Sequence, residues 1–216
     1  MMGILEDFLA YWPQLLNGLW VSIRLALLTF LIGIPGGLLL AIATMSKKKA
    51  LRYVAVAFVE IGRGTPALVV LQVVYFGMPF TLTAFISAGI ALGLTTASYT
   101  SEIIRGGLQA VPQGEVEAAH ALGMKPVTVM RDVIIPQGMR IALPALVSFC
   151  VIMFQATTLA FSIAVPELMS QAKSISSATF HYFNLFVIVG VMYGVITITA
   201  SALIDRLELR MSRHLA

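Results

Sequence analysis

The chain has 216 residues, of which 59% are apolar and only 11% are charged, and its mean hydropathy is +0.93. A soluble domain of this length has too small an interior to bury so much apolar surface, so the composition indicates a membrane protein. The formal charge of +4 does not indicate nucleic-acid binding, because the basic residues lie in loops between apolar segments. The single cysteine, Cys150, excludes a disulfide framework and a thiolate metal site.

Five apolar segments are long enough to cross a bilayer as helices, so we expect an all-α membrane protein in which residues 1–216 form one transmembrane domain. The expected spans, with boundary errors of about four residues, are 19–45, 53–76, 82–104, 141–165 and 183–203. Residues 1–13 are rich in aromatic side chains and end at Pro13, which predicts a separate helix at the membrane interface. We expect no cleavable signal peptide, because Glu6 and Asp7 stand where one would carry Lys or Arg.

The basic residues are distributed unequally around these spans. Eleven of the fourteen fall after the first, third and fifth spans: Lys47, Lys48, Lys49, Arg52, Arg105, Lys125, Arg131, Arg140, Arg206, Arg210 and Arg213. The opposite side holds only Lys173, while Arg24 and Arg63 lie within predicted spans. The positive-inside rule then predicts an external N-terminus, a cytoplasmic C-terminus and a cytoplasmic loop over residues 105–140.

This loop contains a polar segment, residues 117–136, which read EAAHALGMKPVTVMRDVIIP. The segment is too polar to enter the bilayer, and its pattern is typical of amphipathic helix. Gly123 and Pro126 break it into two short helices, because proline cannot continue the first one without strain. Pro136 marks the return toward the fourth span. The residues that can share one helical face are Ala118, Ala119 and Leu122.

Five residues of the same segment stand at the spacing of a known sequence motif: Glu117, Ala118, Ala119, Gly123 and Pro136. With Val133 and Ile135 as conservative substitutions, the segment resembles the EAA loop of permease subunits of bacterial ATP-binding-cassette importers. The run Arg63-Gly64-Thr65-Pro66 is similar to the Arg-Gly-Thr-Pro motif of the branch that imports polar amino acids. Residues 99–107 (YTSEIIRGG) resemble the end of span three in that branch, so the resemblance covers nearly the whole chain.

The resemblance implies a type I importer fold in the bacterial cytoplasmic (inner) membrane, with this chain forming half of a translocation pathway for an amino acid. The implied partners are a second permease subunit, identical or homologous, a dimer of cytoplasmic ATP-binding subunits and an extracytoplasmic substrate-binding protein. ATP and Mg are then bound by the partner ATPase, and this chain carries no cofactor. The residues implied to couple to the ATPase are Glu117, Ala118, Ala119, Gly123 and Pro136. Small side chains there allow close approach of a partner, and Glu117 can accept charge-assisted hydrogen bonds.

One candidate cluster for the substrate pathway is Arg63, Gly64, Thr65 and Pro66. Gly64 and Pro66 predict a broken helix whose second half begins near Thr65 and presents free N–H groups suited to a substrate carboxylate. Two alternatives stay open, namely a structural pair between Glu60 and Arg63, three positions apart, and a gate hinge. Glu102 and Arg105 have the same spacing and predict another structural pair.

The other candidate cluster lies in the middle of span four and contains Gln155, Thr157 and Thr158. Gln155 and Thr158 can line one helical face, although threonine hydroxyls in helices also bond back to their own backbone. Members of the resembled family often carry a Lys-Asp pair at the positions of Gln155 and Ala156, with the acid implicated in substrate contact. This chain has neither charge, which leaves open a different second permease that supplies it.

Other classes of protein stay open at this point. A self-sufficient secondary transporter or channel is one alternative, but such proteins often contain paired broken helices, and the run 63–66 has no second copy. A membrane scaffold without transport is another. The chain has no G-x-x-x-x-G-K-[ST] phosphate loop, and its three histidines lie far apart in sequence, so we expect neither an enzyme nor a metal site. The solute and the identity of the second permease are not predicted.

Overall fold

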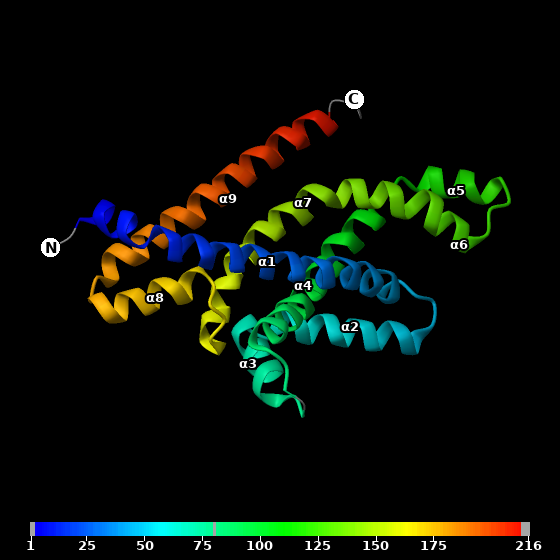
Figure 1. Cartoon of the computed structure of the whole chain (residues 1–216). Coiled ribbons are helices and arrows are strands. Elements are labelled where there is room, and N and C mark those ends of the chain that lie inside the picture. Colours follow the sequence, from blue (N-terminus) through cyan, green and yellow to red (C-terminus); the bar gives the residue numbers. More distant parts are fainter. Residues whose placement is uncertain (1–2, 80, 213–216) are drawn as a thin grey trace. The chain divides into compact units, whose positions relative to one another are not determined.

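The structure is a computed structural model that describes residues 3–79 and 81–212, with side chains up to residue 202. The described secondary structure is entirely helical (Figure 1), which confirms the expected all-α class for this part of the chain. The helices are α1 (Ile4–Thr44), α2 (Lys49–Gly64), α3 (Ala67–Gly77), α4 (Ala84–Gln109), α5 (Gln113–Ala121), α6 (Pro126–Val129), the π-helical turn η1 (Met130–Ile134), α7 (Ile135–Ala156), the 3₁₀ helix η2 (Thr157–Ile163), α8 (Leu168–Thr179) and α9 (Tyr182–Ser212).

Three helical stretches of the described chain are long and apolar enough to cross a membrane, and the pair α2 and α3 makes a fourth if it counts as one broken span. The three are Ile4–Thr44, Pro126–Ile163 and Tyr182–Ala202. Helix α4 occupies the place of the expected third span but is not among them. Its serine and threonine side chains lower the hydropathy of the helix. Most of them are buried, so they face protein and not lipid. The count of five spans stays a prediction.

Helix α1 runs without a break past Pro13, so the expected separate interfacial helix is wrong at its boundary. Proline removes one backbone donor and usually ends or bends a helix. Here the segment before Pro13 is held by tertiary packing, because Phe8 and Tyr11 pack against the buried cluster that α8 and α9 supply. These contacts keep the helical path through the proline.

Pro136, which was expected to mark the return toward the fourth span, lies in the first turn of α7 and within a longer helical stretch. This stretch begins at Pro126 and continues through η1 into α7. Within η1 the N–H of Ile135 donates to the carbonyl of Met130, five residues earlier. The π-helical turn changes the hydrogen-bond register just before the proline, which lets the helix continue without the missing donor.

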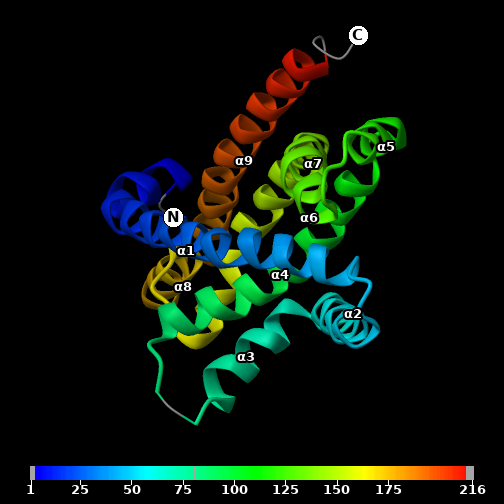
Figure 2. The same ribbon diagram turned by 90° about the vertical axis from the view of Figure 1, so that its right-hand side faces the viewer.

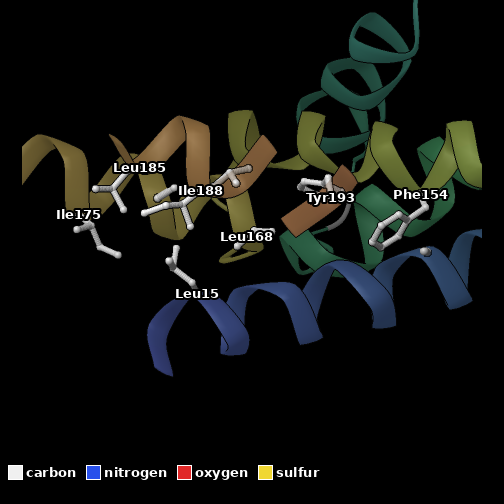
Figure 3. Close-up of a cluster of buried hydrophobic side chains, with 10 residues drawn as sticks. Leu15, Phe154, Leu168, Ile175, Leu185, Ile188 and Tyr193 are labelled. Carbon is white, nitrogen blue, oxygen red and sulfur yellow. The ribbon is translucent and has the colours of Figure 1, made fainter. Parts of the chain in front are cut away.

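The contacts divide the chain into two compact units. The first comprises Met1–Ile32, Thr65–Gly93 and Cys150–Ala216. Its core (Figure 3) is built by α1, α8 and α9 together with the end of α7. The fully buried side chains include Leu15, Leu168, Leu185 and Val165.

The second unit comprises Gly33–Gly64 and Leu94–Phe149. Its core residues are Ala41, Ile104, Leu108, Ala142 and Leu146. Three glycines allow helix backbones to approach closely. An added Cβ at Gly37 would overlap Thr100, one at Gly62 would overlap Ser98, and one at Gly107 would overlap Gly138. Small residues at helix contacts are typical of membrane helices, which gain stability from close packing.

Candidate functional site

The segment around α5 is closed by a turn at Gly123. The Gly123 N–H donates to the carbonyl of His120 at 2.9 Å, and the Met124 N–H donates to the carbonyl of Ala119 at 3.2 Å. These two bonds form a Schellman cap, whose first residue beyond the helix takes a left-handed conformation. Gly123 has φ +77°, which glycine adopts without the penalty of a Cβ. The predicted break into two short helices is therefore confirmed.

The candidate coupling residues do not all face the same way. Ala118 and Glu117 are exposed, and the Gln113 side chain donates to Glu117 Oε1 at 2.9 Å. Ala119 is only 5% exposed, while Leu122 is 83% exposed. Helix α5 contacts α6 and η1, and Figures 1 and 2 show it beside that end of the helical stretch. Ala119 thus packs inward, and Ala118 and Leu122 form the outward side.

The last coupling candidate, Pro136, is exposed in the first turn of α7. Glu115 of α5 accepts a hydrogen bond from the side chain of the neighbouring Gln137. This contact ties α5 to the start of α7 within the second unit. Pro136 therefore lies beside the element that carries the other coupling candidates.

Arg63 lies in the last turn of α2, within a cluster of four charged residues. Both predicted pairs are present, with Arg105 Nε 3.0 Å from Glu102 Oε1 and Nη2 2.5 Å from Oε2, and with Arg63 Nη1 3.9 Å from Glu60 Oε1. Arg63 Nη1 also lies 3.6 Å from Glu102 Oε2, a contact that spacing alone did not predict. Glu102 therefore joins the two pairs into one network between α2 and α4.

Tyr99 fixes the backbone at the end of α2. Its hydroxyl donates to the carbonyl of Arg63 at 3.1 Å, and its ring stacks on Phe149 with centroids 5.3 Å apart. The guanidinium carbon of Arg63 lies 5.9 Å from the centroid of the Tyr99 ring, within cation–π range. The side chain and the carbonyl of Arg63 are thus both held by one tyrosine.

The predicted helix break at the Arg-Gly-Thr-Pro run is confirmed. Helix α2 ends at Gly64, and α3 begins at Ala67 with Pro66 as its N-cap residue. Gly64 and Pro66 are exposed, and Thr65 is half-buried. An added Cβ at Gly64 would meet no atom within 4 Å, so close packing does not explain the glycine.

The second candidate cluster lies at the junction of α7 and η2. The hydroxyls of Thr157 and Thr158 donate to the carbonyls of Phe154 and Gln155 at 2.7 and 2.8 Å, so both bond back to their own helix. Gln155 is exposed and Thr158 half-buried, whereas Thr157 is fully buried. This cluster belongs to the first unit and Arg63 to the second.

Sequence reasoning missed Glu167, which is 0% exposed. Its carboxylate caps α8 by accepting from the N–H groups of Met169 at 2.9 Å and Ser170 at 2.7 Å. Burial raises the pKa of Glu167 to about 7, against the opposing effect of these backbone donors. A glutamate directly before an amphipathic stretch was the available signal, but glutamate is not among the preferred N-cap residues.

Asp7 was also missed, and it is 0% exposed at the start of α1. Its two carboxylate oxygens lie 2.9 Å from His181 Nδ1 and 2.6 Å from Asn184 Nδ2. The contact joins the beginnings of α1 and α9 within the first unit. Over residues 3–79 and 81–212 no three His, Cys, Asp or Glu residues are grouped so as to hold a metal ion. His214 and Arg213 lie outside the described residues.

Long apolar helices that carry charged pairs and buried hydroxyls define an α-helical integral membrane protein. Residues 33–213 match the model of the family described as "Binding-protein-dependent transport system inner membrane component". The chain belongs to this family.

Two relatives are similar over nearly their whole length. The histidine/lysine/arginine/ornithine transport system permease protein HisM of Escherichia coli (strain K12) is 36% identical over 235 residues, which cover 99% of this chain and 97% of HisM. The probable amino-acid permease protein YxeN of Bacillus subtilis (strain 168) is 33% identical over 214 residues, which cover 96% of each chain.

Solved structures give the same fold. A chain of an amino acid ABC transporter, crystallised with histidines, superposes with a TM-score of 0.88 at 37% identity and covers 97% of this chain and 99% of its own. A chain of the MetNI methionine ABC transporter superposes with a TM-score of 0.71, covering 91% of this chain and 97% of its own. The latter is 18% identical, so it supports the fold alone.

Proposed function

We propose that this chain is the permease subunit of an ATP-driven amino acid importer, forming half of the translocation pathway. The family and the names of two relatives, both permeases for amino acids, support this assignment. ATP and Mg are bound by a separate ATPase, and the chain itself is not an enzyme. The solute is an amino acid.

The observation that carries the proposal is the exposure of Leu122, which is 83% exposed at the end of α5. Val127, in α6 beyond the Gly123 turn, is 78% exposed. Apolar side chains exposed on a segment too polar for the bilayer favour a protein-binding surface. The partner that suits this surface is a cytoplasmic ATP-binding subunit, with Glu117 and Ala118 beside Leu122 as further contacts.

For the pathway we propose Arg63, Gly64, Thr65 and Pro66 together with Gln155, Thr157 and Thr158. Arg63 suits a substrate carboxylate because its ion pairs, at 3.6 and 3.9 Å, are longer than hydrogen bonds and its side chain is 37% exposed. In the second cluster the accessible polar groups are those of Gln155 and Thr158. Thr157 contributes through the packing of the turn beneath them.

The assembly that follows contains a second permease, identical or homologous, a dimer of ATP-binding subunits and an extracytoplasmic substrate-binding protein. We place the chain in the bacterial cytoplasmic membrane with five spans, an external N-terminus and the α5 segment in the cytoplasm. The unequal distribution of Lys and Arg supports this orientation. A second permease completes the pathway, because the spans of one chain form only half of it.

A co-purification experiment tests the coupling surface. The chain is expressed with its ATP-binding subunit, and Leu122→Glu is compared with Lys48→Ala, a change on the same expected side of the membrane. We expect Leu122→Glu to lose the ATPase and Lys48→Ala to keep it, because a carboxylate at Leu122 must be desolvated on docking. Full retention of the ATPase by Leu122→Glu would contradict the coupling assignment.

A further inference from the structure

Glu167 is fully buried, and its hydrogen-bond partners within the described residues are two backbone N–H groups and two hydroxyls. Two of these partners are the backbone N–H groups that open α8. The other two are hydroxyls, from Ser22 of α1 and Tyr193 of α9, each 3.4 Å from Oε2. One carboxylate therefore connects three helices of the first unit.

The two hydroxyls are connected to each other as well. Ser22 Oγ lies 3.0 Å from the Tyr193 hydroxyl and accepts from the Leu168 N–H at 3.3 Å. Gly18, one turn before Ser22, lets α1 approach this closely, since a Cβ there would lie 2.9 Å from the Leu168 Cα. A buried network in which each group has a partner fixes the positions of its members.

Tyr193 extends this network to the candidate pathway. Its hydroxyl lies 3.5 Å from Thr157 Oγ1, and its ring centroid is 5.2 Å from that of Phe154 (Figure 3). Thr157 is the first residue of η2, and the next residue, Thr158, is the half-buried pathway candidate. Because Thr157 donates its own hydrogen to Phe154, the single hydrogen of the Tyr193 hydroxyl is shared between Glu167 and Thr157, and Tyr193 lies between the carboxylate and the turn that carries Thr158.

We propose that Glu167 is a positioning residue for transport, which acts through Tyr193 to hold Thr157 and so sets the orientation of the Thr158 side chain in the pathway. This inference rests on the proposed function, because it takes Thr158 as a substrate contact. Glu167 itself is buried and does not touch the solute. Loss of the contact between Glu167 and Tyr193 weakens substrate binding at Thr158, while the ATPase surface on α5 stays unchanged.

The test uses the complete complex in proteoliposomes with the purified binding protein and a panel of labelled amino acids that includes histidine. The amino acid that the unmodified complex takes up fastest is the probe. Tyr193→Phe removes the hydroxyl but keeps the ring packing, and Glu167→Gln keeps the shape but places an amide donor among the N–H groups of α8. We expect the apparent KM for uptake to rise about fivefold in each variant, as loss of one buried hydrogen bond implies. Basal ATP hydrolysis per assembled complex stays at the unmodified level.

Two comparisons separate positioning from a structural role. Tyr182→Phe makes the same chemical change outside the network and leaves the KM unchanged. The double variant of Glu167 and Tyr193 raises the KM by less than the product of the single effects, because both changes break one path. If Glu167 acts only as a structural cap of α8, its substitution lowers the amount of assembled complex and the maximal rate together and leaves the KM unchanged.

Failure of the inference and failure of the proposed function give different results. If the unmodified complex shows no ATP-driven uptake of any amino acid tested, the proposed function falls and the inference falls with it. If the unmodified complex transports and both single variants keep its KM, the inference alone is overturned. A raised KM with additive effects in the double variant also overturns it, since Glu167 would then not act through Tyr193.

Discussion

The Tyr99 hydroxyl donates a 3.1 Å hydrogen bond to the backbone carbonyl of Arg63, across 36 positions of sequence. The acceptor lies in the last turn of α2, one residue before the helix ends at Gly64. A helix end in a membrane protein needs partners for its final carbonyl groups, because lipid offers none. Tyr99 therefore stabilises the broken helix at the point where the candidate pathway begins.

Tyr99→Phe removes this hydrogen bond and keeps the stacking on Phe149. We expect transport to fall about fivefold, the effect of one lost hydrogen bond, because the end of α2 is then less firmly held. Uptake by the reconstituted complex measures the change. Tyr53→Phe is the matched control, since Tyr53 is 62% exposed. Equal uptake by Tyr99→Phe and Tyr53→Phe would show that the bond has no part in transport.

The charge network makes a prediction about coupling between Arg63 and Glu102. Arg63→Gln and Glu102→Gln each remove one charged partner from the network while Glu60 and Arg105 remain, so each single change is expected to lower the melting temperature of the complex. The double change is expected to destabilise by less than the sum of the two, with an interaction free energy of about 0.5–3 kcal/mol. Thermal unfolding of the four proteins gives this value. Strictly additive effects would mean that the 3.6 Å contact is energetically silent.

Gly123 provides a test of the turn that closes α5. Gly123→Val is expected to release the ATPase or to separate ATP hydrolysis from transport, because a left-handed conformation costs an ordinary residue roughly 1–2 kcal/mol. Gly123→Asn is expected to keep more coupling, since asparagine tolerates this conformation better. Gly114→Ala is the control within the same helix, where an added Cβ meets no atom within 4 Å. Equal loss in the valine and asparagine variants would show that close approach, and not backbone conformation, explains the glycine.

Glu167 predicts how stability depends on pH. Burial raises its pKa from 4.5 to about 7 in the folded protein, so the folded state holds the proton more tightly than the unfolded state. The resulting stabilisation is complete below pH 4.5 and is lost as the pH rises through about 7. The melting temperature should therefore fall more steeply between about pH 5 and pH 8 in the unmodified protein than in Glu167→Gln.

The control for this prediction is built into the comparison. Tyr193 is the titratable group that contacts Glu167. The other contacts of Glu167, with Ser22 and with the α8 backbone, involve groups that do not titrate in this range. Parallel curves for the two proteins would contradict the assignment of the pH effect to Glu167.

Local spacing predicted the local features of the candidate site. Residues three apart on a helix face each other, which gave the pairs of Glu60 with Arg63 and of Glu102 with Arg105. Helix α2 ends at Gly64, just before Pro66, and α5 ends just before the left-handed Gly123. Each of these features depends on a few consecutive residues, so one sequence suffices to predict it.

Features that depend on tertiary contact were not predictable. Asp7 pairs with His181 across 174 positions, and Ser22 contacts Glu167 across 145. No periodicity in the sequence relates residues so far apart. Pro13 was expected to end a helix, but the packing of Phe8 overrides that local preference. The π-helical turn at Met130–Ile134, just before Pro136, was not predicted either.

Uptake of labelled amino acid by proteoliposomes tests the central claim most directly. The liposomes contain this chain with its ATP-binding subunits, and a panel of labelled amino acids that includes histidine and arginine is supplied with the binding protein outside. We predict uptake that requires both ATP at the ATPase and the binding protein, and that Leu122→Glu abolishes. Uptake that persists without the ATPase would instead identify a self-sufficient transporter or channel. ATPase binding without any uptake would identify a scaffold and contradict the account.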